Sequence, residues 1–477
     1  MTSLFSYILL LCLILLAVSI PGHPLHIDEA WIGEQAYYLA RDGYVHSTLF
    51  AEPGGGDAVL ILYHRLFVLA GSIAVEVFGW DIWPLRLVTI ISGLGLLAAM
   101  ALYMRRELKR PVEEALPAIL LLLLIPITFT HFKIYRPEIM MTLFGFLSYW
   151  SLERHEKTGL ARYAAASGLL AGLAALTHLY GLIFPICAFI MLLRSRRWAG
   201  VGIFAALAAV PFIPYLIDIA AHQDLFRREI TSPIASRKTS FTLVTPFLNL
   251  LEEHKRLFRT IEIAPVVILF ILSLVLNLKR RYRERRLFYE YSILLVLLLG
   301  AIAPDKLVTR YAIPLFPFFA IEIADALRSI LPRGSASNLI RVPMFLMAAI
   351  LLGYGLYFQT VTAFDERENV AALNERIGTI LPDSARCLGP MNLIFNQIER
   401  CSIVGLYPAV KQHADSLTLA DAAAYARLRR ARYIVINRLA TNEEVIVDMA
   451  QKKNSGYDSL AIIAETDEFL VMEVRLD

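Results

Sequence analysis

Near-continuous apolar runs recur along most of this chain of 477 residues and constrain its fold more than any other feature. The sequence is 57% hydrophobic and only 18% charged, which would give a water-soluble protein an unmanageable apolar surface. Most runs approach the length that a helix needs to cross a bilayer. We therefore expect a polytopic α-helical membrane protein. The runs are 4–20, 87–103, 115–130, 139–152, 163–193, 201–220, 263–278, 291–303, 312–327 and 343–361.

One run, 163–193, is too long for a single span and breaks around residues 178–181, so we interpret it as two short spans. The sequence then predicts about eleven transmembrane helices. A further apolar segment, 58–78, contains a His-Arg pair and a Glu, whose charges are costly at the middle of a bilayer. We interpret this segment as an interfacial or re-entrant helix within the first outer loop.

Five connections between the runs are rich in Lys and Arg, which is typical of loops on the cytoplasmic side. This orientation puts the N-terminus in the cytoplasm, places the loops 21–83 and 221–262 outside, and exports the tail. We therefore expect a multi-pass protein of the plasma (inner) membrane. The basic connections are 105–110, 154–162, 194–197, 279–286 and 328–341.

Two features leave alternatives open. The first run could be a cleaved signal peptide, because Ala17-Val18-Ser19 resembles a cleavage site, but residues 1–7 contain no Lys or Arg, which favours an uncleaved span. The outer loop 221–262 holds seven Lys and Arg residues, which conflicts with the orientation rule. Its cations would either clamp a lipid phosphate or lie on anionic headgroups.

The tail 364–477 has frequent charges and short apolar runs, so we expect a separate exported α/β domain after a membrane domain at 1–363. Cys387 and Cys401 fall in this domain, where they would form a disulfide or remain two free thiols. Thr418 is a candidate N-cap. The elements expected are helices at 365–381, 418–431 and 443–453, and strands at 433–436, 460–464 and 469–474.

Carboxylates and cations gather at the outer ends of the apolar runs. Such groups fit transfer from a phosphate-bearing lipid: a carboxylate takes a proton from an acceptor hydroxyl or amine, and cations stabilise the departing phosphate. Nucleotide sugars and ATP are not available outside the cytoplasm, so a lipid donor is the natural energy source. The residues are Asp28, Glu29, His131, Lys133, Arg136, Glu138, His178, Asp305, Lys306 and Arg310.

These residues lie in stretches that resemble a known family. Residues 26–36, HIDEAWIGEQA, resemble the first-loop motif of the GT-C glycosyltransferases, specifically the protein mannosyltransferase and aminoarabinose transferase group that uses polyprenyl-phosphate sugars. Further similar stretches follow in the family's order and cover most of the membrane region. They are Phe78-Gly79 with Pro84-Leu85-Arg86-Leu87, then Arg136-Pro137-Glu138, then 172–178, then Arg310-Tyr311-Ala312-Ile313-Pro314.

The resemblance implies a GT-C fold and a role for each matching residue. Asp28 would be the general base, Glu29 would support it, and Glu138 would be the second acidic residue of the site. Two departures from the family pattern occur: Glu138 replaces a commoner Asp, and His178 replaces a Lys and would hold a phosphate firmly only when protonated. The expected contacts of the donor phosphate are Arg310, Lys306, Lys133, Arg136 and His178.

Together these features predict an inverting glycosyltransferase that moves a sugar from a polyprenyl-phosphate donor to a glycolipid, glycan or protein acceptor on the exported face. The first loop and the basic outer loop would shape the donor site. The residues identify no resident cofactor with certainty, they leave a divalent metal open without indicating one, and we expect no nucleic-acid partner. A transporter or flippase of a lipid-linked glycan, or a non-enzymatic assembly subunit, remains the alternative.

Overall fold

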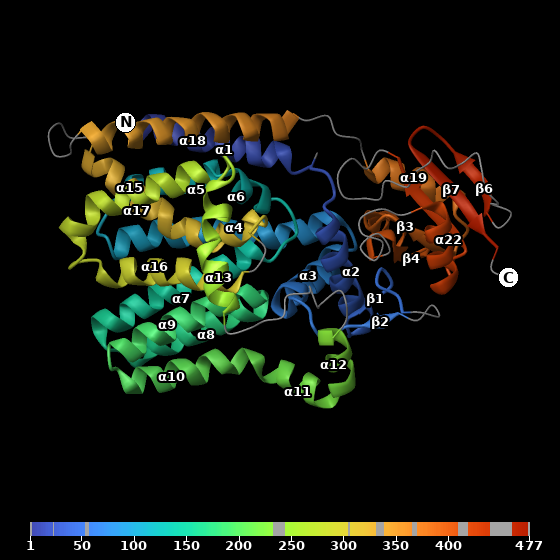
Figure 1. Ribbon diagram of the computed structural model, residues 1–477, viewed down its shortest axis with the longest axis horizontal. Helices are drawn as coiled ribbons and strands as arrows, with labels where there is room; N and C mark the ends of the chain where they lie inside the picture. The colour runs from blue at the N-terminus through green and yellow to red at the C-terminus, as the bar shows by residue number, and fades with distance from the viewer. Residues whose placement is uncertain are drawn as a thin grey trace.

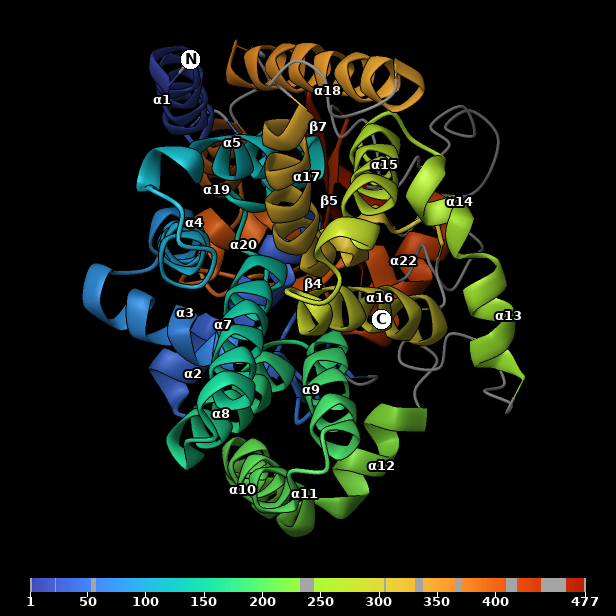
Figure 2. The same ribbon diagram turned by 90° about the vertical axis from the view of Figure 1, so that its left-hand side faces the viewer.

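The computed structural model is a bundle of helices with a small α/β unit at one end (Figure 1). At the other end, seen face-on in Figure 2, α1 and α18 lie side by side on one flank, and α10 with α11 lies on the opposite flank. The structure describes residues 2–21, 23–52, 57–231, 244–303, 306–330, 338–364, 370–408, 418–438 and 460–475.

Every predicted apolar run is helical, and the predicted break is confirmed, because α8 ends at Thr177 and α9 begins at Ile183 after the 3-10 turn η2 (Leu179–Leu182). The run 115–130 is divided instead of continuous, since Pro126 has no amide hydrogen to extend the first helix. The bundle helices are α1 (Thr2–Ser19), α4 (Ile82–Arg106), α5 (Leu116–Leu124), α6 (Pro126–His131), α7 (Glu138–Thr158), α8 (Ala161–Thr177), α9 (Ile183–Arg194), α10 (Trp198–Ala209), α11 (Ile213–Ala221), α15 (Ala264–Arg281), α16 (Arg286–Ile302), α17 (Phe316–Ile330) and α18 (Asn338–Phe364).

Three helical stretches in the described part of the chain are long and apolar enough to cross a membrane, namely Ile82–Arg106, Trp198–Ala221 and Ile340–Phe364. The other helices of the bundle are shorter or less apolar. The chain is therefore a helical membrane protein, while the total of about eleven spans remains a prediction.

The described residues of the predicted basic connections gather at the end of the bundle opposite the α/β unit (Figure 1). Ion pairs join them: Asp325 near the end of α17 accepts a hydrogen bond from Arg110 at 2.9 Å and also pairs with Arg281. Arg194, at the end of α9, pairs with Glu290 of α16 at 2.5 Å. The basic connections therefore lie at one end of the bundle, as their common orientation requires. The side of the membrane that this end faces remains a prediction.

The first loop folds into α2 (Ile27–Asp42), a two-stranded hairpin of β1 (His46–Ser47) and β2 (Ala58–Val59), and α3 (Arg65–Phe78). The segment 58–78 is thus a strand followed by a helix, and not one continuous helix as predicted. The exposed side chains Leu69, Ile73 and Val77 recur every four residues and form an apolar stripe on α3. Such a stripe fits an interfacial helix.

The second outer loop contributes three short helices within its described residues: α12 (Gln223–Thr231), α13 (Thr245–Leu251) and α14 (Glu253–Phe258). Glu229 of α12 accepts the backbone N–H groups of Ile61 and Leu62 at 2.6 and 2.7 Å, which ties this loop to the first one. Beside this junction, α12 and the β1–β2 hairpin border a cavity of about 590 Å³. Of the predicted cations of this loop, Arg237 and Lys238 lie outside the described residues.

The tail forms a five-stranded sheet in the order β4-β3-β5-β7-β6, with β4, β3 and β5 parallel and β7 and β6 antiparallel to their neighbours. The sequence predicted the last three strands in chain order but missed β3 and β4, which have only four residues each. The elements are α19 (Val370–Ile380), β3 (Arg386–Gly389), η5 (Met391–Leu393), α20 (Ile394–Gln397), β4 (Ser402–Gly405), α22 (Leu419–Leu428), β5 (Tyr433–Asn437), β6 (Leu460–Glu465) and β7 (Phe469–Val474).

Details of the tail match part of the prediction. Thr418 is the N-cap of α22, where its hydroxyl accepts the backbone N–H of Asp421 and completes a capping box. Cys387 and Cys401 are both buried free thiols, so the disulfide alternative is not observed. The predicted helix 443–453 lies outside the described residues.

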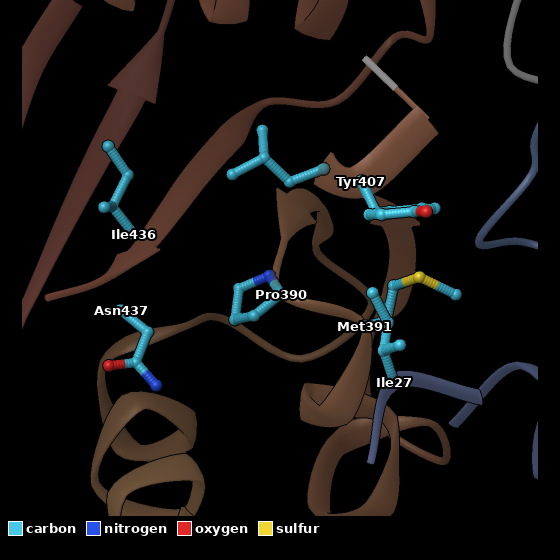
Figure 3. A pocket seen from close by; sticks show the side chains of 7 residues that line it. Ile27, Pro390, Met391, Tyr407, Ile436 and Asn437 are labelled. Carbon is cyan, nitrogen blue, oxygen red and sulfur yellow. The ribbon is translucent and has the colours of Figure 1, made fainter. Parts of the chain in front are cut away.

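The α/β unit packs against the first loop. Trp80 stacks on Phe395 with ring centroids 5.4 Å apart, and the backbone N–H of Gly405 donates to the carbonyl oxygen of Leu49 at 2.9 Å. Ile27, the first residue of α2, and Met391 of the α/β unit both line a water-sized hollow of about 10 Å³ (Figure 3). The start of α2 is therefore held between the bundle and the α/β unit.

Candidate active site

The start of α2 presents the two acidic residues of the HIDEAWIGEQA stretch. His26 is the N-cap: its Nδ1 accepts the backbone N–H of Asp28, and its own backbone N–H donates to Glu29 at 2.9 Å. The Asp28 side chain remains 25% exposed, whereas that of Glu29 is completely buried. Two adjacent carboxylates therefore occupy very different environments.

Glu29 is held in a dense set of hydrogen bonds. Arg86 of α4 donates to both of its carboxylate oxygens, at 2.8 and 2.9 Å, and the backbone N–H of Tyr135 donates at 2.8 Å. Arg86 also donates to the carbonyl oxygen of Ile20 at 3.0 Å. The pair thus joins the end of α1, the start of α2, the start of α4 and the loop before α7. This geometry favours a positioning role for Glu29 beside Asp28.

Arg136 connects Asp28 to Glu138, the third acidic residue of the site. Its guanidinium pairs with Asp28 and donates to Glu138 at 2.7 Å. Arg310, in the 3-10 turn η4 (Thr309–Leu315), approaches the same Glu138 carboxylate with its Nε at 3.6 Å. Glu138 is only 1% exposed, while Arg310 is 30% exposed. Residues predicted from three distant parts of the sequence thus form one cluster, in which Asp28 and Arg310 remain accessible.

His178 lies at the turn between α8 and η2, stacked on His64 of the first loop with ring centroids 4.7 Å apart. Burial lowers the pKa of His64 to about 4, and burial together with the neighbouring His64 lowers the pKa of His178 to about 3. Both rings are therefore neutral at pH 7. The backbone N–H of Tyr180 donates to Nδ1 of His178, so the ring hydrogen is on Nε2. His178 can offer a phosphate an uncharged N–H but not a cation.

Lys306 is buried and already has three acceptors. Its ammonium donates to Glu253 of α14 and to the carbonyl oxygens of Gly300 and Ala303, each at 2.8 Å. Arg256 of α14 also donates to Ala303 at 3.0 Å. An ammonium has three hydrogens, and all of them are engaged here. The geometry therefore favours Lys306 as a link between α14 and the segment before Arg310, and its predicted contact with the donor phosphate stays untested.

Lys306→Met is accordingly expected to lower the stability of the protein by about 1–3 kcal/mol, because Glu253 loses a buried partner. The KM for the donor should change less than twofold in Lys306→Met. The matched variant Arg310→Met should raise that KM about tenfold or more, since an accessible cation next to the acidic cluster is lost. Thermal unfolding in detergent and donor titration measure both effects. A stable Lys306→Met protein with a raised donor KM would restore the phosphate role.

Lys133 is buried, and its ammonium lies 4.9 Å from the ring centroid of Phe129. It belongs to the same loop as Arg136. Asp305, another predicted outer charge, lies outside the described residues. Lys133 therefore remains a candidate on sequence grounds.

The sequence analysis did not identify several buried charged residues near the candidate site. Arg86 was noticed only as part of a family motif, and Glu253 was not singled out. Glu34 is fully buried, accepts four hydrogen bonds from residues 47–49, and has its pKa raised by burial to about 7. These residues could have been recognised as charged residues flanked by apolar ones, because a charge that becomes buried requires a partner.

Comparisons with known proteins show which family model and which solved structures the chain resembles. A family model described as dolichyl-phosphate-mannose-protein mannosyltransferase matches residues 66–217. ArnT from Cupriavidus metallidurans bound to undecaprenyl phosphate has a similar structure, with a TM-score of 0.66 at 14% identity, over 99% of this chain and 98% of that one. The same protein in the apo state gives 0.65 at 14% identity, over 100% and 98%.

A more distant similarity involves the oligosaccharyltransferase of Archaeoglobus fulgidus tethered with an acceptor peptide. Its TM-score is 0.57 at 12% identity, over 91% of this chain and 69% of that one. No curated protein sequence matches the chain significantly. The chain therefore shares the fold of ArnT, and its residues 66–217 match the protein mannosyltransferase family model.

Proposed function

We propose that this protein is a glycosyltransferase that moves a sugar from a polyprenyl-phosphate donor to an acceptor on the exported face, with Asp28 as the base. The observation that carries the proposal is the different exposure of three carboxylates. Glu29 and Glu138 are buried among cations, whereas the Asp28 side chain is 25% exposed at the same cluster. A base must reach the proton that it removes, and Asp28 alone of these three is accessible.

The reaction is a single displacement. The acceptor hydroxyl or amine attacks the anomeric carbon of the sugar while its proton passes to the Asp28 carboxylate. The bond between the anomeric carbon and the phosphate oxygen breaks, and its electron pair leaves with the polyprenyl phosphate. One displacement inverts the configuration at the anomeric carbon. Every step is thus assigned to the substrates and to one carboxylate of the chain.

The departing phosphate gains negative charge and needs cations that are already in position. Arg310 supplies one: its guanidinium is 30% exposed and lies beside Glu138. Arg136 is held between Asp28 and Glu138 and contributes positive charge to the same cluster. His178 adds a neutral N–H. We propose Arg310 as the main contact of the donor phosphate, with Arg136 and His178 assisting.

The similar proteins support the substrate classes. ArnT is seen bound to undecaprenyl phosphate, and the Archaeoglobus oligosaccharyltransferase is seen with an acceptor peptide and with a dolichol-phosphate. We accordingly propose a polyprenyl-phosphate sugar as donor and a glycolipid, glycan or protein as acceptor. The basic end of the bundle would face the cytoplasm, and the unit after Phe364 would form the exported domain of a plasma-membrane protein. No resident cofactor is proposed.

The test is transfer of labelled sugar by the purified protein in liposomes, with polyprenyl-phosphate sugars as donors and glycolipid, glycan and protein fractions of the cell envelope as acceptors. Formation of a labelled acceptor is the expected result. The alternative function, a flippase of a lipid-linked glycan, predicts movement of the intact labelled lipid between leaflets without a new glycosidic bond. Lipid movement without any labelled acceptor would therefore replace the proposal by the alternative.

A further inference from the structure

His131 has one ring nitrogen whose hydrogen position is fixed by the backbone. It ends α6, and its side chain is buried, with 4% of the residue exposed. Nδ1 lies 2.8 Å from the carbonyl oxygen of Ile127. A carbonyl oxygen only accepts hydrogen bonds, so Nδ1 carries the hydrogen. Burial lowers the pKa of His131, which follows the predicted span 115–130, and the ring is therefore neutral at pH 7. Its Nε2 is a lone-pair acceptor.

This Nε2 atom has no hydrogen-bond partner among the residues that the structure describes. A buried acceptor without a partner is unfavourable, because it has left water without gaining a hydrogen bond. The atom is therefore a candidate for a hydrogen bond that forms only when a ligand is present.

The position of His131 restricts which ligand this can be. Helix α6 packs against η4, the turn that carries Arg310. The ring of His131 is close enough to interact electrostatically with Glu138 and Arg310, and it also affects His26 at the N-cap of α2. It is thus a neighbour of the acidic cluster.

Because the lone pair of Nε2 can only accept a hydrogen bond, the ligand group at His131 must be a hydrogen-bond donor. Ionised phosphate oxygens are acceptors, so they cannot pair with Nε2 of a neutral His131. His178 has the opposite arrangement, with its ring hydrogen on Nε2, and can donate to such an oxygen. The ligand group at His131 must instead be a hydroxyl or an amine. The two histidines therefore offer complementary hydrogen-bonding groups at one site.

We propose that Nε2 of His131 accepts a hydrogen bond from a substrate hydroxyl or amine, and that His131 is a substrate-binding residue of the transfer site. Two substrates could supply this group: the nucleophile of the acceptor, or a hydroxyl of the sugar being transferred. The inference rests on the proposed function and adds a residue to it. It also assigns the residue a direction of hydrogen bonding.

Two variants separate this role from a structural one. His131→Asn keeps an amide N–H near the position of Nδ1, so it preserves the bond to Ile127 and removes the acceptor at Nε2. His131→Gln places an amide oxygen near the position of Nε2 and loses the bond to Ile127. We expect His131→Asn to raise the KM of one substrate about tenfold, and His131→Gln to restore at least part of that loss. The acceptor and donor are varied separately, and the affected KM identifies the source of the group.

His222→Asn is the matched control. His222 is exposed, and its Nδ1 makes the same type of contact, 3.1 Å from the carbonyl oxygen of Asp218 four residues earlier. We expect this variant to behave like the wild type. Thermal unfolding of each variant shows whether the fold is kept.

The results that would overturn the inference are distinct from failure of the proposed function. A wild-type KM for both substrates in His131→Asn, with a defect in His131→Gln, would make His131 structural. If the wild type transfers no sugar, donor and acceptor are titrated separately and binding is read from the shift of the unfolding midpoint. Equal shifts for the wild type and His131→Asn with both ligands would equally reject the role of His131.

Discussion

Asp28→Asn is expected to lower the turnover of sugar transfer by about 10²–10⁴-fold, which is the usual contribution of a general base. The amide cannot take the proton of the acceptor, while its size and position at the start of α2 stay the same. The donor KM should not rise, because Arg136 loses a competing carboxylate and keeps its pairing with Glu138. Steady-state kinetics at matched protein levels measure both quantities.

The chain offers a closely matched control for this variant in Asp42→Asn. Asp42 ends the same helix α2, is also paired with an arginine, Arg41, and has a side chain that is 24% exposed, compared with 25% for Asp28. Loss of its charge should leave turnover nearly unchanged. Turnover of Asp28→Asn within about threefold of the wild type would remove Asp28 from the chemistry and require another base.

Local patterns of the sequence predicted most of the helical architecture. The apolar runs, the break before Ile183 and the cap at Thr418 depend on residues close together in the chain, so each could be recognised from a short window. The same holds for the stretches that contain Asp28, Glu138 and Arg310. Their order along the family pattern indicated one site before any distance was known.

The features that sequence reasoning missed depend on contacts between distant residues. The partners Glu29 and Arg86 are 57 positions apart, and Lys306 meets Glu253 across 53 positions. A sequence does not distinguish a lysine that is paired with a buried glutamate from a lysine that is free to bind a phosphate. The tautomer of His131 was equally invisible, because it follows from one carbonyl oxygen of the folded helix.

The buried pair of Glu29 and Arg86 gives the second large effect. Arg86→Met is expected to lower the free energy of unfolding by about 3–5 kcal/mol, because it leaves a fully buried carboxylate without its cation. Glu29→Gln leaves a buried guanidinium with only carbonyl partners and should cost a similar amount. The double variant Glu29→Gln/Arg86→Met removes both charges and should be more stable than the sum of the single changes predicts. The midpoint of thermal unfolding in detergent gives all three values.

The same experiment decides what Glu29 does. If Glu29 only positions Asp28, turnover in Glu29→Gln should fall together with stability, and the double variant should recover part of both. If Glu29 instead takes part in the chemistry, the double variant should recover stability without recovering turnover. Glu473→Gln in the α/β unit is the control, because its partner Arg432 is largely exposed and the loss of such a pair has little effect. The complete burial of Glu29, with three nitrogen donors from Arg86 and Tyr135 around its carboxylate, makes the first outcome the expected one.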